Sequence, residues 1–155
     1  MIRLFSCAAL FGATMLGHAP SLAHFATDAA AHGATGAGRA GERVSRTVTV
    51  SMADSMRFSP DALVVKRGAT LKIIARNDGA ALHEIVLGTR DEIGGHRAAM
   101  KRDPAMAHGA PYMAHVAPGA SEQLVWQFDR PGVFEYACLL PGHYEAGMTG
   151  SITVL

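Results

Sequence analysis

Three side chains that bind soft metals stand at regular intervals near the C-terminus. Cys138, His143 and Met148 follow the spacing C-x4-H-x4-M, in a segment that also contains Pro141 and Gly142. Thiolate, imidazole and thioether donors suit a soft metal, and copper uses all three as it changes between two oxidation states. Each residue alone is more often part of the packing than a ligand. Three such donors in one short loop predict a metal site.

A fourth donor is expected from a distant part of the chain, and His83 is the candidate. Two His, one Cys and a weakly bound Met make the trigonal blue-copper site of electron transfer. A multicopper oxidase would have histidines on both sides of the cysteine, but Ala137 and Leu139 flank Cys138. A dinuclear copper centre would need two cysteines in this loop. We therefore expect one isolated copper that exchanges electrons without binding dioxygen, and no enzyme.

These residues resemble the ligand set of the cupredoxins, and the likeness covers residues 46–155. The resemblance implies an all-β, Greek-key sandwich or barrel in which His83, Cys138, His143 and Met148 hold one type 1 copper at one end. His83-Glu84 and residues 141–148, Pro-Gly-His-Tyr-Glu-Ala-Gly-Met, are most similar to periplasmic cupredoxins linked to copper tolerance.

This likeness implies a periplasmic protein that transfers single electrons to or from a redox partner, such as a cytochrome or a copper oxidase or reductase. The alternative is a periplasmic copper-tolerance protein that binds or oxidises excess copper.

The first 23 residues have the pattern of a signal peptide. Arg3 supplies the positive start, residues 4–16 are apolar, and Ser21-Leu22-Ala23 offers small residues for cleavage. The apolar run is too short to anchor the chain across a bilayer, so no stable membrane insertion is expected. Cleavage would remove Cys7 and leave Cys138 without a thiol partner in an oxidising compartment. Metal ligation would protect that thiol.

Residues 24–45 are rich in Ala, Gly and His and show no hydrophobic periodicity, so we expect a flexible leader before a single domain at residues 46–155. Basic residues are scattered along the chain, and the formal net charge is only +1. This distribution excludes a nucleic-acid partner of the usual basic kind. We expect a monomer.

Short strands must bring these ligands together. Val48 and Val50 alternate with polar residues, and similar apolar segments follow between turn signals such as Asn77-Asp78-Gly79. We expect strands near residues 46–51, 56–58, 63–65, 70–77, 82–87, 123–128, 133–137 and 150–155. This spacing favours an antiparallel sandwich or barrel. His83 would open one strand and Cys138 would follow another, so two strands meeting at one end can deliver both donors.

Residues 88–119 interrupt this pattern with a helix expected at 91–102, followed by a long loop. Ile93, His96 and Met100 share one face of the helix. The loop adds further soft donors, namely Met106, His108, Met113 and His115. These donors either form a second copper(I) site or pack over and shield the first copper, and the sequence leaves both readings open.

Apolar residues also surround His143, namely Leu139, Leu140, Pro141 and Tyr144. They would either dock a redox partner close to the copper or only seal the loop. The sequence does not distinguish between these two roles.

Overall fold

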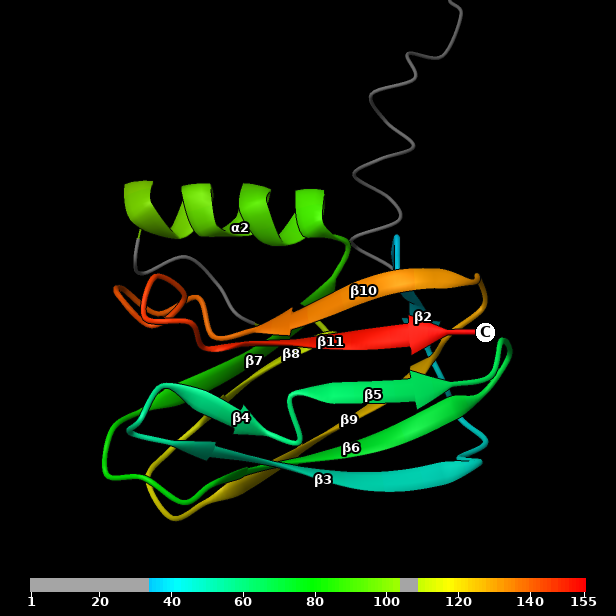
Figure 1. Ribbon diagram of the computed structural model, residues 1–155, viewed down its shortest axis with the longest axis horizontal. Helices are drawn as coiled ribbons and strands as arrows, with labels where there is room; N and C mark the ends of the chain where they lie inside the picture. Colours follow the sequence, from blue (N-terminus) through cyan, green and yellow to red (C-terminus); the bar gives the residue numbers. More distant parts are fainter. Residues whose placement is uncertain (1–33, 104–108) are drawn as a thin grey trace, which may run out of the picture.

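The chain forms two β-sheets packed face to face. A computed structural model describes residues 34–103 and 109–155 (Figure 1). The expected signal peptide, residues 1–23, lies outside the described residues. Within the described part of the chain, none of the helices has the length and apolar character that crossing a membrane requires.

The first sheet has six strands in the order β1-β2-β9-β6-β3-β4. Their bounds are β1 Ala34–Thr35, β2 Gly38–Ala40, β9 Ser121–Gln127, β6 Thr70–Asn77, β3 Arg46–Ala53 and β4 Arg57–Ser59. The second sheet has five strands in the order β5-β11-β10-β7-β8. Their bounds are β5 Ala62–Val65, β11 Thr149–Val154, β10 Gly132–Ala137, β7 His83–Gly88 and β8 Met113–Val116.

The prediction of an all-β sandwich is confirmed, but the expected antiparallel arrangement is wrong for two pairs. β3 pairs with β6 in parallel, and β5 pairs with β11 in parallel. After β3 and β4 the chain crosses to the second sheet as β5 and then returns as β6, so β6 runs in the same direction as β3. The sheets are therefore mixed. Local alternation reports which face of a strand is buried, not the direction of its neighbour.

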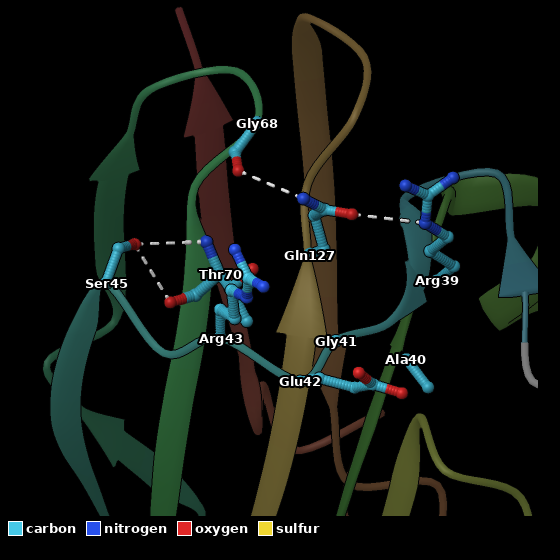
Figure 2. A pocket seen from close by; sticks show the side chains of 9 residues that line it. All are labelled: Arg39, Ala40, Gly41, Glu42, Arg43, Ser45, Gly68, Thr70 and Gln127. Atoms are coloured by element: carbon cyan, nitrogen blue, oxygen red, sulfur yellow. Dashed lines mark hydrogen bonds between the residues drawn. The ribbon is translucent and has the colours of Figure 1, made fainter.

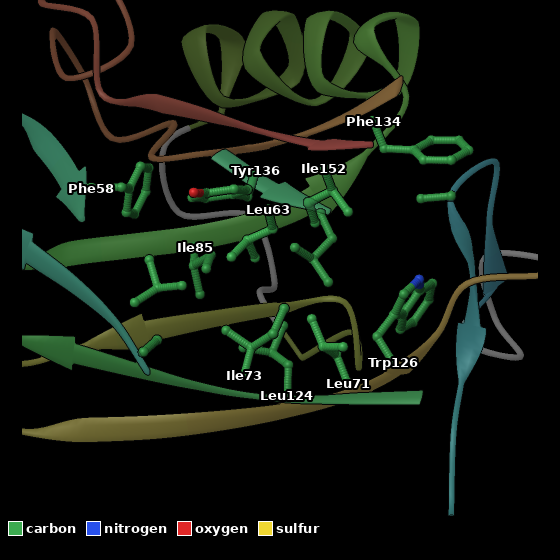
Figure 3. Close-up of a cluster of buried hydrophobic side chains, with 14 of the residues drawn as sticks. Phe58, Leu63, Leu71, Ile73, Ile85, Leu124, Trp126, Phe134, Tyr136 and Ile152 are labelled. Atoms are coloured by element: carbon green, nitrogen blue, oxygen red, sulfur yellow. The ribbon is translucent and has the colours of Figure 1, made fainter. Parts of the chain in front are cut away.

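The core lies between the sheets, where alternate residues of each strand meet (Figure 3). In β3, Val50 and Met52 are buried while Thr49 and Ser51 are not. Trp126 of β9 and Tyr136 of β10 are the largest completely buried side chains. The Tyr136 hydroxyl donates a hydrogen bond to the carbonyl oxygen of Pro60 at 2.6 Å, which satisfies its polar end inside the core.

Strand β7 is buried along its whole length. It lies between β10 and β8, and helix α2, Arg90–Arg102, packs over the outer face of the sheet (Figure 1). The helix begins with a capping box, in which Thr89 and Glu92 satisfy each other's backbone N–H groups. The helix prediction is confirmed to within one residue at its start. Because both faces of β7 are covered, Ile85, Val86 and Leu87 are buried in succession without alternation.

Part of the segment that we expected to be loop is a strand. Residues 113–116 form β8, which pairs with β7, so residues 88–119 do not simply interrupt the sheet. The sequence Met-Ala-His-Val is too short an apolar pattern to predict a strand. These residues are extended because they pair with the edge of β7.

Two short strands, β1 and β2, lie within residues 24–45, the segment expected to be a flexible leader. β2 pairs with β9, with Arg39 opposite Gln127, and Ala37 is completely buried. The backbone groups at the free edge of β9 bind this segment although its composition contains no strand signal. With Ser45, Gly68, Thr70 and other residues it lines an open pocket of about 450 Å³ (Figure 2).

Candidate metal centre

His83 opens β7, and its ring is completely buried. The ring nitrogen Nε2 lies 3.3 Å from Oδ1 of Asp54. The other nitrogen, Nδ1, is buried and has no hydrogen-bond partner in the described part of the chain. A buried polar atom without a partner is costly unless something else binds it. Nδ1 is therefore the atom that is free to bind a metal.

Cys138 follows β10 directly, and β10 pairs with β7 through Ala137 and Val86. This register places the thiol beside the start of β7. The backbone N–H of Glu84 donates to Sγ of Cys138 at 3.3 Å, and Nδ1 of His143 lies 3.2 Å from the same sulfur. The side chain of Cys138 is completely buried.

His143 and Met148 are placed by a tight turn between β10 and β11. The N–H of His143 donates to the carbonyl of Leu140, and the N–H of Met148 donates to the carbonyl of His143, both at 3.0 Å. The N–H of Cys138 donates to the carbonyl of Met148 at 3.1 Å and closes the turn. Met148 is completely buried in the same core cluster as Cys138, whereas His143 is half-buried.

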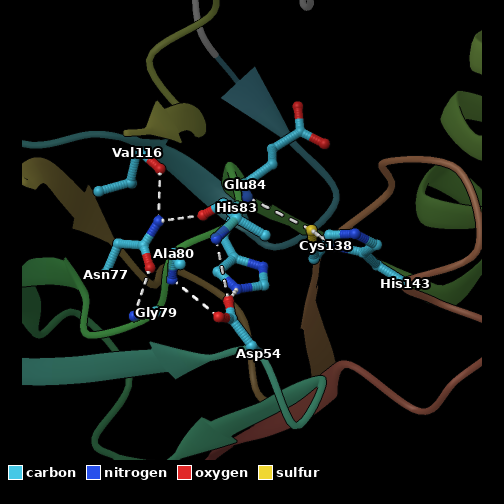
Figure 4. Close-up of polar contacts among 10 residues, drawn as sticks. Asp54, Asn77, Gly79, Ala80, His83, Glu84, Val116, Cys138 and His143 are labelled. Atoms are coloured by element: carbon cyan, nitrogen blue, oxygen red, sulfur yellow. Dashed lines mark hydrogen bonds and ion pairs between the residues drawn. The ribbon is translucent and has the colours of Figure 1, made fainter. Parts of the chain in front are cut away.

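The donor atoms of His83, Cys138 and His143 all lie within 4.8 Å of one another (Figure 4). The centroids of the two imidazole rings are 5.2 Å apart. One sulfur and two nitrogens at this spacing match the plane of a copper site with Cys and two His. The residues present therefore fit copper, and Met148 adds the thioether of the predicted set.

Burial shapes the protonation of these donors. Burial raises the pKa of the Cys138 thiol to about 11, although hydrogen bonds from the backbone of Glu84 and Leu140 oppose the shift. Burial, followed by the nearby ring of His83, lowers the pKa of His143. The thiol thus keeps its proton near neutral pH until a metal displaces it, while the His143 ring is neutral and ready to bind.

Sequence reasoning missed a buried carboxylate beside the ligands. Glu84 is completely buried, and its Oε2 accepts a hydrogen bond from the N–H of Leu139 at 3.3 Å. Its Oε1 lies 3.2 Å from Nε2 of His115 on β8. Glu84 therefore connects β7, β8 and the ligand loop. The available signal was an acidic residue within a strand whose other members are buried, because such a residue needs partners.

The further soft donors of residues 88–119 separate in the structure. Met113 packs with Ile93, Val86 and Leu139 between α2 and the sheet, and Met100 is also buried. His115 lies beside Glu84. Met106 and His108 lie outside the described residues. In the described part of the chain, the one cluster of three His, Cys or acidic residues with the spacing of a metal site is His83, Cys138 and His143.

The surface near His143 differs in part from the expected apolar patch. Leu139 is buried beneath α2, and Pro141 is the exposed member of that set. A groove of about 240 Å³ runs between α2 and the ligand loop, with Leu140 and Arg97 among its lining residues. The Arg97 guanidinium lies 4.7 Å from the centre of the Tyr144 ring, so α2 braces this loop.

Two mixed sheets with these donors at one end define a cupredoxin with one type 1 copper site, made by His83, Cys138, His143 and Met148. Residues 44–155 match the family described as copper binding proteins of the plastocyanin/azurin family, and the chain belongs to that family.

Relatives cover most of the chain. A protein of Rubrivivax gelatinosus named copper-resistant cuproprotein CopI is 45% identical over 97% of this chain and 94% of that protein. A Pseudomonas aeruginosa protein of the same name is 32% identical over 72% of this chain and 77% of its own length. Among solved structures, reduced auracyanin from Roseiflexus castenholzii superimposes with a TM-score of 0.61, at 22% identity over 73% of this chain and 99% of auracyanin.

Proposed function

We propose that this protein acts in copper resistance, holding copper at its type 1 site outside the cytoplasm. The observation that carries the proposal is the near full-length similarity to a protein named for copper resistance, joined to a complete donor set in this chain. Copper tolerance is the alternative hypothesis from the sequence, and the names of the relatives favour it over electron transfer as the main role.

Four side chains would hold the metal. Nδ1 of His83, Sγ of Cys138 and Nδ1 of His143 would supply the close donors, and the Met148 thioether would supply a weaker one. When bound, copper supplies a one-electron couple. The sandwich keeps His83, Cys138 and Met148 away from water, since all three are completely buried. The ligands come from β7 and from the loop between β10 and β11 of one sheet, and such a fixed frame would suit rapid electron exchange.

Electron transfer is the second candidate, favoured by the position of His143. It is the one ligand that is not fully buried, and Leu140, Pro141 and Tyr144 adjoin it in the same turn. A redox partner such as a cytochrome or a copper oxidase or reductase would contact the protein at this edge. Ala137 and Leu139 flank Cys138 where a multicopper oxidase would have histidines, so we propose no oxidase activity.

The deciding experiment compares a host strain lacking this gene with strains complemented by the wild type or by Cys138→Ser. Resistance predicts growth inhibition at elevated copper, rescue by the wild type only, and unchanged respiration. Normal growth on copper together with slower reduction of a cytochrome would favour electron carriage instead. Immunoblots must confirm equal amounts of the two proteins. The visible spectrum of the copper(II) protein provides the direct check, because a colourless wild type would refute the type 1 site.

We also propose export to the periplasm and a monomeric state. The N-terminal pattern of residues 1–23 supports export, and Cys138 is the free cysteine of the described residues. Cell fractionation with N-terminal sequencing of the mature protein tests the first point. Sedimentation analysis tests the second.

A further inference from the structure

The ring of His83 is held from its far side by a carboxylate. Asp54 follows β3, which pairs with β6 up to Met52 and Asn77, so Asp54 lies opposite the loop that leads to His83. Its Oδ1 lies 3.3 Å from Nε2 of His83 (Figure 4). A carboxylate accepts hydrogen bonds and cannot donate them when ionised, so Nε2 must carry the proton. Nδ1 is then left with its lone pair, and it is the nitrogen without a partner.

The Asp54 carboxylate is itself fixed in place. It accepts hydrogen bonds from the backbone N–H of Ala80 at 2.8 Å and of Ala81 at 3.1 Å. These two amides fix the position of the carboxylate beside the ring of His83. A side chain at Gly79 would collide with the carboxylate, so the loop is shaped around it.

The same loop is held from the inside by Asn77, which is buried. Its Oδ1 accepts from the N–H of Gly79 at 2.9 Å, and its Nδ2 donates to the carbonyls of Ala81 and Val116 at 2.8 and 2.9 Å. Asp54 and Asn77 therefore hold residues 77–81 between them, and the position of His83 follows from that loop.

We propose that Asp54 is the positioning residue for the ligand His83: its carboxylate accepts the Nε2–H of the ring and presents Nδ1 to copper as a strengthened donor. The proposal rests on the copper site proposed above. A ligand histidine bound to a carboxylate keeps one tautomer and one orientation and becomes more basic. A more basic imidazole stabilises copper(II) over copper(I), so Asp54 lowers the reduction potential of the site.

The first test uses the copper-free protein and two matched variants. Asp54→Ala removes the carboxylate that contacts His83. Asp78→Ala removes an equal charge from the same loop, where Asp78 binds Arg76 at 2.7 and 2.9 Å. NMR of the His83 ring should reveal a slowly exchanging Nε2–H in the wild type and in Asp78→Ala, and rapid exchange in Asp54→Ala. An unprotected Nε2–H in the wild type, or unchanged protection in Asp54→Ala, would overturn the proposal.

The second test measures the loaded protein. Loss of such an outer partner typically weakens metal binding by about 10- to 100-fold. We expect that loss of copper(II) affinity, and a raised midpoint potential, in Asp54→Ala but not in Asp78→Ala. Asp54→Asn, which keeps a carbonyl acceptor but loses the charge, should lie between wild type and Asp54→Ala. Equal shifts in Asp54→Ala and Asp78→Ala would mean a general charge effect and would refute the specific role.

The two tests separate this proposal from the copper site on which it rests. A wild type that stays colourless with copper(II) refutes the site, yet the NMR experiment still measures the bond between Asp54 and His83. A coloured wild type whose affinity and potential do not respond to Asp54→Ala refutes the role of Asp54 and leaves the site standing.

Discussion

The backbone N–H of Glu84 donates a hydrogen bond to the sulfur of Cys138 at 3.3 Å, and this bond joins the strand of one ligand to the loop of the others. Glu84 is the neighbour of His83 in β7, whereas Cys138 lies 54 positions further along the chain. The carboxylate of Glu84 also accepts a hydrogen bond from the backbone N–H of Leu139, the residue that follows Cys138. Two different groups of Glu84 therefore hold the ligand loop against β7.

Removal of the Glu84 carboxylate should destabilise the copper-free protein. Glu84→Leu leaves the buried N–H of Leu139 without its acceptor, and a buried group left unsatisfied costs about 1–3 kcal/mol. Glu84→Gln retains one carbonyl oxygen and should cost less. Denaturant unfolding measures both changes. Glu122→Gln, an exposed change on β9, is the control and should shift the free energy of unfolding by less than about 0.5 kcal/mol. A Glu84→Leu variant as stable as the wild type would contradict this role.

Copper binding should depend on pH through Cys138. Its pKa of about 11 in the copper-free protein means that the thiol is protonated at lower pH, so each copper(II) bound must displace that proton. The His143 ring, whose pKa is lowered, is already neutral above pH 7 and releases none. Between about pH 7 and pH 9 the apparent affinity should rise about tenfold per pH unit. The rise should level off once the pH exceeds the thiol pKa. Competition titrations measure the slope, which should disappear in Cys138→Ser.

The two histidines should differ in chemical rescue. His83→Ala opens a space inside the protein, because this ring is completely buried, whereas His143→Ala opens one at a half-buried turn. External imidazole should therefore restore the visible band of His143→Ala at lower concentration. Titration of each copper(II)-loaded variant with imidazole gives the comparison. Equal rescue of the two would argue against the difference in access.

Met148 should tune the reduction potential without determining the colour. Met148→Leu removes the axial thioether and should raise the potential, since copper(II) loses a donor. Met148→Gln supplies a harder oxygen and should lower it. Leu conserves volume at this buried position and should cost less than about 1.5 kcal/mol of stability. Voltammetry of both variants is the measurement. An unchanged midpoint in both would place another group at the axial position.

The combined change of Met100, Met106 and Met113 to Leu should leave the copper stoichiometry at one per chain. Met100 belongs to α2, and Met113 belongs to β8 and packs against Ile93 of the helix. Both side chains are buried, and Leu has nearly the same volume as Met, so the packing should hold. Copper(I) titration of the wild type and the variant is the test. If the wild type binds a second copper(I) and the variant does not, with its blue band intact, these methionines form a site. Lower copper tolerance of the host would then assign that site to resistance.

By itself, the sequence determined the donor set. Cys138, His143 and Met148 lie within one turn, so their spacing along the chain already limits their spacing in space. The alternating and apolar segments predicted eight of the eleven strands in the described part of the chain and the helix, because burial of one face is a local pattern. His83 was identified because copper needs a second imidazole and because this residue opens a strand.

Only the tertiary structure decided how these elements pair and what supports the ligands. The parallel pairing of β3 with β6, the strand at residues 113–116 and the pairing of β2 with β9 depend on partners far away in the chain. Asp54 binds a ring 29 positions away, and Glu84 binds an N–H 55 positions away. Such contacts depend on strand register and on the crossing between sheets, which local patterns do not encode. The sequence alone therefore does not show that Asp54 contacts a ligand histidine or that Glu84 contacts the ligand loop, because the fold brings these groups within hydrogen-bond distance.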